Sequence, residues 1–308
     1  MKGEVYPKGM EPMTIDLATL AFMALRNHLF NSAGQAIPFS LRPKQNTQAD
    51  PFDEYLTTRV FAKLEDVQCE KAPGPLITPD MVLFRRSLCL GMSAGDLCND
   101  TRRIISIEVK KLERTHPGSI ARASGLDYNT TPPCGRARVY DAKGQTLDIR
   151  SFYLFVCIES YPIDTSQVVV SALALVDGNI LNTDFSYYLS IIGHREKEIG
   201  LGSYGDGADR KRPMVIFSNP LGAKELDRKV SLVHPDPGLD SQISNLRLVY
   251  QIERTLASGG INHFYCYRVA TDVAEDWAVR TLKDPFPTPT RDVKTQPRGR
   301  FRLSFPIH

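Results

Sequence analysis

The chain has 308 residues, 42% of them hydrophobic and 24% charged, which is the composition of an ordinary soluble protein with room for a large core. The formal net charge is only +3 at pH 7, which excludes identifying a nucleic-acid binder from overall charge. Any DNA contact must come from local basic patches, such as residues 210–212 or the basic tail after residue 290.

The sequence predicts neither a membrane segment nor an export signal. The apolar run at residues 17–25 is too short to span a bilayer, and acidic rather than basic residues precede it. The six cysteines include no Cys-x-x-Cys pair, which argues against a zinc site and against a disulfide framework. We therefore expect reduced thiols in a cytoplasmic protein.

The first half of the chain alternates helix and strand signals. Thr14 or Asp16 can cap a buried helix that runs to about Phe30. Asp50-Pro51 opens a second helix with apolar residues at helical spacing, which a Pro/Gly-rich segment ends at residues 71–75. Two apolar runs follow, at residues 76–84 and 104–112, and we expect them to be antiparallel neighbours.

The remainder is predicted to consist mainly of strands. Residues 115–135 lack a regular pattern and suit either a recognition loop or an ordered connection, and residues 136–150 resemble a hairpin. A helix is possible at residues 182–192, and residues 194–213 form a polar loop. Further strands are predicted at residues 153–158, 168–176, 214–218, 246–252 and 263–269. With no repeat and no clear linker, one elaborated α/β domain over residues 1–308 is expected.

The strand at residues 103–111 carries the strongest functional signal. Its side chains alternate with period two between the faces of a sheet. Three aliphatic residues share one face and three polar residues the other: Ile105, Ile107 and Val109 against Ser106, Glu108 and Lys110. If this strand pairs with residues 76–84, Asp80 and Glu108 converge on one divalent cation with Lys110 beside it.

An acidic-x-Lys triplet is weak evidence alone, because this sequence contains five of them. They are Glu108-x-Lys110, Asp141-x-Lys143, Asp209-x-Lys211, Asp227-x-Lys229 and Asp292-x-Lys294. Only the first lies in a strong aliphatic strand and follows a strand-borne Pro-Asp. The remaining four fall in a hairpin tip, a loop, a charged turn and the tail. Context therefore selects Glu108 and Lys110.

These residue types suit phosphodiester hydrolysis. Mg²⁺ prefers oxygen ligands and keeps several waters, so two carboxylates leave positions for a phosphate and a nucleophilic water. A neighbouring lysine can hold that water and stabilise its deprotonated form. The alternative is a half-exposed strand whose outward face simply carries solvated charges.

The segment Thr78-Pro79-Asp80, followed by Ile107-Glu108-Val109-Lys110, resembles the signature of the PD-(D/E)xK nuclease superfamily, and among its members type II restriction endonucleases. The resemblance implies Asp80 and Glu108 as metal ligands, Lys110 as the water-activating group, and Glu54 as an auxiliary acid. It also implies an α/β (α+β) fold with a mixed central sheet flanked by helices. A catalytic core would occupy about residues 50–180, and residues 181–308 would add recognition or dimerisation elements.

The resemblance covers roughly 35 residues. The family pattern places a good helix after the lysine strand, whereas only a short, weak helical stretch follows here, so the later strand order stays open. Five basic residues are candidates for DNA contacts, although for each taken singly solvated surface is the favoured reading: Arg136, Arg138, Arg195, Lys211 and Arg212.

The leading expectation is a Mg²⁺-dependent, site-specific endonuclease of double-stranded DNA. It would act as a homodimer, because cutting both strands of a palindromic site suits two symmetric active sites. One alternative is a repair, recombination or modification-dependent nuclease with the same centre. Another is a non-catalytic DNA-binding or structural protein whose charged strand is incidental.

Overall fold

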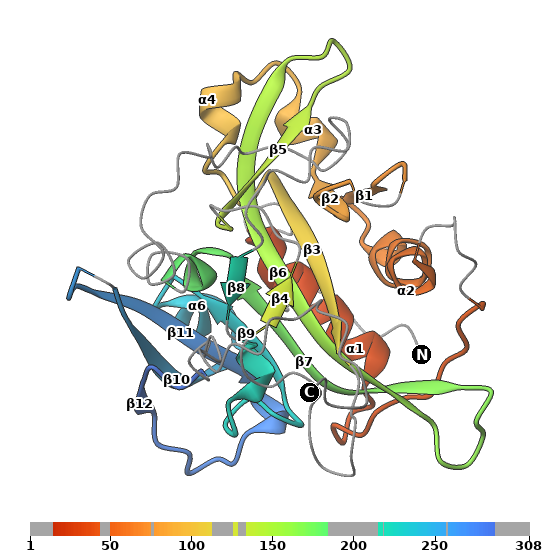
Figure 1. Cartoon of the computed structure of the whole chain (residues 1–308), viewed down its shortest axis with the longest axis vertical. Helices are drawn as coiled ribbons and strands as arrows, with labels where there is room; N and C mark the ends of the chain where they lie inside the picture. Colours follow the sequence, from red (N-terminus) through yellow and green to blue (C-terminus); the bar gives the residue numbers. More distant parts are fainter. Residues whose placement is uncertain are drawn as a thin grey trace, which may run out of the picture.

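The protein has a mixed α/β fold built on a ten-stranded sheet (Figure 1). The structure, a computed structural model, describes residues 15–43, 50–74, 77–112, 126–128, 134–183, 215–217, 219–256 and 258–286. The expected fold class, a mixed sheet flanked by helices, is confirmed in these residues.

The strands of the main sheet follow the order β1-β2-β3-β6-β7-β9-β11-β10-β12, and β5 pairs with β6 outside this path. The bounds are β1 Gln68–Lys71, β2 Met81–Phe84, β3 Ile104–Leu112, β5 Arg136–Tyr140, β6 Thr146–Ser160, β7 Val168–Asp177, β9 Val230–His234, β10 Leu246–Thr255, β11 Ile261–Val269 and β12 Arg280–Lys283. A separate pair joins β4, Leu126–Tyr128, to β8, Val215–Phe217.

The helices are few and mostly short. They are α1 Leu17–Leu29, α2 Pro51–Tyr55, η2 Leu56–Val60, η3 Phe61–Lys63, α3 Arg86–Cys89, α4 Ala94–Leu97, η4 Pro220–Gly222, α6 Leu239–Gln242 and η5 Ala270–Asp272. No helix in the described ranges is long and apolar enough to cross a membrane.

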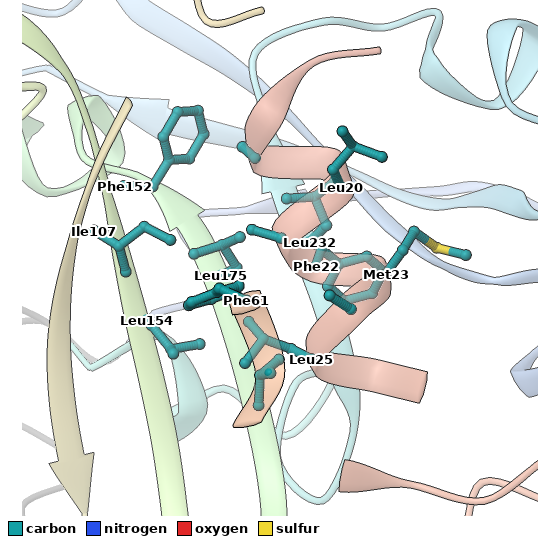
Figure 2. Packing of buried hydrophobic residues seen from close by; sticks show 14 of the residues in the cluster. Leu20, Phe22, Met23, Leu25, Phe61, Ile107, Phe152, Leu154, Leu175 and Leu232 are labelled. Atoms are coloured by element: carbon teal, nitrogen blue, oxygen red, sulfur yellow. The ribbon is translucent and has the colours of Figure 1, made fainter. Parts of the chain in front are cut away.

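Helix α1 covers one face of the sheet, as its apolar sequence predicts. Its N-cap, Asp16, accepts hydrogen bonds from the backbone N–H groups of Ala18 and Thr19. Eleven of its thirteen residues are buried. Figure 2 shows Phe22 and Leu25 of this helix packed with Leu154 of β6 and Leu175 of β7. The central strands are thus apolar on the helix side.

The second predicted helix is present, but its winding changes along its length. Asp50 caps α2 by accepting from the backbone N–H of Phe52 at 2.9 Å. The helix widens into the π-helical turn η2 and ends in η3 at Lys63. The hydroxyl of Thr57 donates to the backbone carbonyl of Asp53, inside the segment where the winding changes. π-Helical turns are frequent at functional sites.

The predicted pairing of the two apolar runs is confirmed, with a shorter first strand. Strands β2 and β3 are antiparallel, in a register that sets Met81 opposite Ile107. The connection between them contains the short helices α3 and α4. Strand β3 then pairs in parallel with β6, which settles the neighbour that the sequence left open.

The rest of the sheet follows the predictions in part. The second strand of the predicted hairpin and the strand predicted at residues 153–158 are one continuous strand, because β6 runs unbroken from Thr146 to Ser160. Strands β7, β8, β10 and β11 confirm the predicted segments, whereas β1, β4, β9 and β12 were not predicted. Residues 179–183 are helical, and the rest of the helix predicted to residue 192 lies outside the described residues. All six cysteines are free, so the absence of a disulfide framework is confirmed.

Candidate active site

Strand β3 divides its side chains between two environments, as the period-two pattern predicts. Ile105 and Ile107 are fully buried in the cluster that includes α1. On the opposite face, the parallel register sets Glu108 beside Tyr153 and Lys110 beside Phe155 of β6. Glu108 is 5% exposed and Lys110 9% exposed. The polar face of β3 is therefore buried. This excludes the alternative in which Glu108 and Lys110 are solvated charges on a half-exposed strand.

Glu108 and Lys110 form a buried ion pair. The Lys110 Nζ donates to Glu108 Oε1 at 2.8 Å, and it lies 6.0 Å from the centroid of the Tyr153 ring. The second carboxylate oxygen, Oε2, is buried and has no hydrogen-bond partner among the described residues. A buried charged oxygen without a partner is costly, so this atom is poised to accept a ligand.

Asp80 reaches the site because it directly precedes β2, which begins at Met81. Its Oδ2 accepts a hydrogen bond from the backbone N–H of Val109 at 2.7 Å, and its carbonyl accepts from the N–H of Ala72 at 2.9 Å. The side chain thus takes the place of a backbone acceptor where the β2–β3 ladder ends. This bond holds the Asp80 side chain beside β3, one residue along that strand from Glu108.

The charge of Glu108 affects the pKa of Asp80. Burial, and then the charges of Glu108 and Asp53, raise the pKa of Asp80 to about 8. The Val109 N–H bond and the charge of Lys110 act in the opposite direction. Carboxylates brought together in a partly desolvated place hold a proton until a cation replaces it.

Asp53 of α2 is the third acid of this cluster. Burial, and then the charge of Asp50, raise its pKa to about 7; Lys111 lowers it and Glu108 raises it further. Its Oδ1 is buried and has no hydrogen-bond partner in the described part of the chain. Sequence reasoning did not select Asp53, although it lies next to the residue that was selected.

The auxiliary acid predicted at Glu54 is corrected by the structure. Glu54 pairs with Arg42 at 2.7 Å, its side chain is 44% exposed, and this ion pair lowers its pKa. Successive residues of a helix are rotated by about 100°. Relative to the buried Leu56, Asp53 is therefore about 60° away and Glu54 about 160° away. The winding thus turns Glu54 toward solvent and Asp53 toward the buried side of the helix.

Lys111 lies on the other face of β3, as the alternation predicts. Its ammonium pairs with the carboxylate of Asp50, which also caps α2. Lys111 therefore ties the strand to the helix that carries Asp53. Lys71, at the end of β1, is a further positive charge that lowers the pKa of Asp53.

The remaining acidic-x-Lys triplets form no comparable cluster where they are described. Asp141 accepts from the backbone N–H groups of Lys143 and Gln145 in the tip of the β5–β6 hairpin, and Asp227 lies in a turn before β9. The triplets at Asp209 and Asp292 lie outside the described residues.

The predicted DNA-contact residues are only partly within the described structure. Arg138 forms a bidentate ion pair with Asp148 across the β5–β6 hairpin, with the closer contact at 2.7 Å. Arg136 donates to the backbone carbonyl of Cys98 at 3.0 Å. Both guanidinium groups thus have structural partners. Arg195, Lys211 and Arg212 lie outside the described residues.

No group of three His, Cys, Asp or Glu side chains within the described residues is arranged to hold a metal ion. The candidate ligands therefore number two, Asp80 and Glu108, with Asp53 as an electrostatic neighbour. Compared with protein-family models, curated proteins and solved structures, the chain matches none. A functional proposal must rest on the residues themselves.

Proposed function

We propose that this protein is a Mg²⁺-dependent endonuclease that hydrolyses phosphodiester bonds of double-stranded DNA, in the manner of a type II restriction enzyme. The observation that carries the proposal is the cluster at the end of the β2–β3 ladder. There Asp80 and the buried Glu108–Lys110 pair meet a third acid, Asp53, in electrostatic contact. Burying several carboxylates close together is energetically unfavourable, and a structural role alone does not explain it.

The side chains fit a divalent cation. Glu108 Oε2 and Asp53 Oδ1 are buried oxygens without hydrogen-bond partners among the described residues. Burial, and then the negative charge of neighbouring carboxylates, raise the pKa values of Asp53 and Asp80. Asp80 and Glu108 would hold Mg²⁺, which favours carboxylate oxygens. When bound, the ion supplies charge neutralisation at the phosphate and lowers the pKa of a water.

The protein's own groups divide the remaining tasks. Lys110 donates to Glu108 from a nearly buried position, so its ammonium is held in one orientation near the carboxylates. We assign it to position the attacking water and stabilise the hydroxide that the water becomes. The Val109 N–H fixes the orientation of Asp80, and the Asp50–Lys111 pair fixes α2 against β3. Such preorganisation is the main source of acceleration in a site of this kind.

The assembly proposed with this activity is a homodimer. One site of this kind cuts one strand, and cutting both strands of a palindromic sequence calls for two sites related by a two-fold axis. The contacts of Arg136 and Arg138 within the protein support a structural role for both. Arg195, Lys211 and Arg212 remain the proposed phosphate or base contacts.

The direct experiment incubates the purified chain with supercoiled plasmid DNA and 5–10 mM Mg²⁺, roughly the range that saturates weak carboxylate sites. Discrete fragments support a site-specific endonuclease. Smearing or structure-dependent nicking supports a repair, recombination or modification-dependent nuclease with the same centre. Binding without cleavage, unchanged in Glu108→Gln, would show a non-catalytic DNA-binding protein and overturn the assignment. Sequencing the ends of discrete fragments then gives the recognition site.

A further inference from the structure

A cavity of about 500 Å³ lies where the C-terminal end of α1 meets the starts of β7 and β9 and the turn after β11. Its lining includes Phe30, Val170, Arg228, Lys229, Arg268 and Asp272. None of these residues belongs to the candidate active site. The volume is within the range of small-molecule sites.

Arg268 is the most informative residue of this cavity, because its charge is buried and forms no ion pair with any carboxylate among the described residues. It is 6% exposed. Its Nε donates to the hydroxyl of Ser231 at 3.2 Å, its Nη2 donates to the backbone carbonyl of Glu225, and its guanidinium lies over the Tyr250 ring. Within the described residues these partners are all neutral. A buried cation normally has an anionic partner, since removal from water is costly.

The other charges of the cavity do not supply that anion. Asp272 is the acidic residue of the lining, and Arg26 binds both of its carboxylate oxygens. Arg228 and Lys229 are exposed at the start of β9 and add two positive charges. Three basic residues thus line the cavity, and none of them forms an ion pair with a carboxylate in the described part of the chain.

We propose that this cavity binds a small phosphate-bearing ligand. A phosphate monoester carries up to two negative charges and several acceptor oxygens, which suit two guanidinium groups and an ammonium. Phe30, Val170 and Val230 give the cavity an apolar wall against which an organic group can pack. A DNA duplex has no small organic group that could enter the cavity and pack against this wall. The site is independent of the proposed nuclease activity.

The experiment is isothermal titration of the full chain at constant ionic strength, in buffer stripped of divalent metals. The two probes are inorganic phosphate and adenosine 5′-monophosphate. The test variant combines Arg228→Asn with Lys229→Gln, because Arg228 has a φ of 52° and Asn tolerates that region. The control is Lys224→Gln, whose side chain is 90% exposed nearby and does not line the cavity.

We expect saturable binding of one equivalent, weakened about tenfold or more in the double variant and unchanged in the control, with both variants folded. Tighter binding of the nucleotide than of phosphate would show that the ligand's organic group packs against the apolar wall. Equal binding assigns the site to the phosphate group alone. Absence of binding for both probes, or binding unaffected by the double variant, would overturn the proposal. Displacement of the bound probe by an equal concentration of a DNA duplex would reassign the cavity to nucleic acid.

Discussion

The carboxylate of Asp80 accepts a hydrogen bond from the backbone N–H of Val109 at 2.7 Å, one residue beyond Glu108. The bond holds Asp80 next to β3, directly before the residue at which the pairing of β2 with β3 begins. It lowers the pKa of Asp80, yet burial and the neighbouring acids outweigh it and raise that pKa to about 8. In the absence of a metal ion, the fold therefore keeps a carboxyl group in a position where its charged form is unfavourable.

The first prediction concerns stability against pH in the metal-free protein. Asp80 has an ordinary pKa of 3.8 and a folded pKa of about 8, so between these values the folded state binds a proton that the unfolded state has lost. The free energy of unfolding must therefore fall as pH rises from 5 through 8. Asp80→Asn keeps an oxygen that can accept from Val109 and removes this dependence.

Thermal unfolding at pH 5 to 9 measures the effect. We expect Asp80→Asn to gain in Tm relative to the parent as pH rises. Glu54→Gln is the control, because the pKa of Glu54 is lowered and its carboxylate stays charged throughout this range. Parallel curves for the parent and Asp80→Asn would show that Asp80 titrates normally.

The second prediction separates two adjacent lysines. Lys110→Ala should slow the chemical step by on the order of 10²–10⁴, as for other positioned proton-transfer groups. Lys110→Arg should also fail, because the planar guanidinium is larger and suits a single bound water poorly. Lys111→Ala should cost little in rate and at most about 1 kcal/mol in stability, since its pair with Asp50 is partly exposed. Single-turnover cleavage at fixed Mg²⁺ makes the comparison, and equal losses at both lysines would contradict the assignment.

The third prediction compares Asp53, the buried acid of α2, with Glu54, the auxiliary acid expected from the sequence. Asp53→Asn should lower the single-turnover rate by about 10–100-fold, the usual effect of losing a group that supports metal ligands. Glu54→Gln should keep the parent rate, because Glu54 pairs with Arg42 at the surface. Circular dichroism checks that both fold. A loss confined to Glu54→Gln would restore the original prediction.

The fourth prediction is proton release on metal binding. At pH 7 the raised pKa values of Asp53, about 7, and Asp80, about 8, leave both groups partly or mostly protonated. Binding of Mg²⁺ should displace on the order of one proton. Affinity should rise between pH 6 and 8.5. Calorimetry in two buffers with different ionisation enthalpies counts the protons, and a pH-independent affinity with no release would exclude these carboxyl groups as the binding site.

Much of this site could be predicted because strand geometry is local. The alternation of Ile105, Ile107 and Val109 with Glu108 and Lys110 requires only a period of two, and the buried face follows directly. Asp16 and Asp50-Pro51 likewise predict the starts of α1 and α2 from capping chemistry alone.

The parts that were missed depend on distant contacts. The pKa of Asp53 is raised mainly by its burial and then by the charge of Asp50, with a smaller contribution from Glu108, which is more than fifty residues away. The helical angle to Leu56 was the one local signal that separates Asp53 from Glu54. Strands β1 and β12 are short edge strands with mostly exposed or half-buried side chains, which give a weak hydrophobic pattern. Arg268 was missed because its burial results from the packing of β9 and β11.

The central claim is that the acids around β3 form a metal-dependent centre for phosphodiester hydrolysis. The most direct test is single-turnover cleavage of plasmid DNA with Mg²⁺ by the parent chain and by Glu108→Gln, which keeps the size of the side chain and removes its charge. We predict discrete fragments from the parent, no cleavage by the variant, and retained folding and DNA binding. Cleavage by Glu108→Gln at the parent rate would contradict the account.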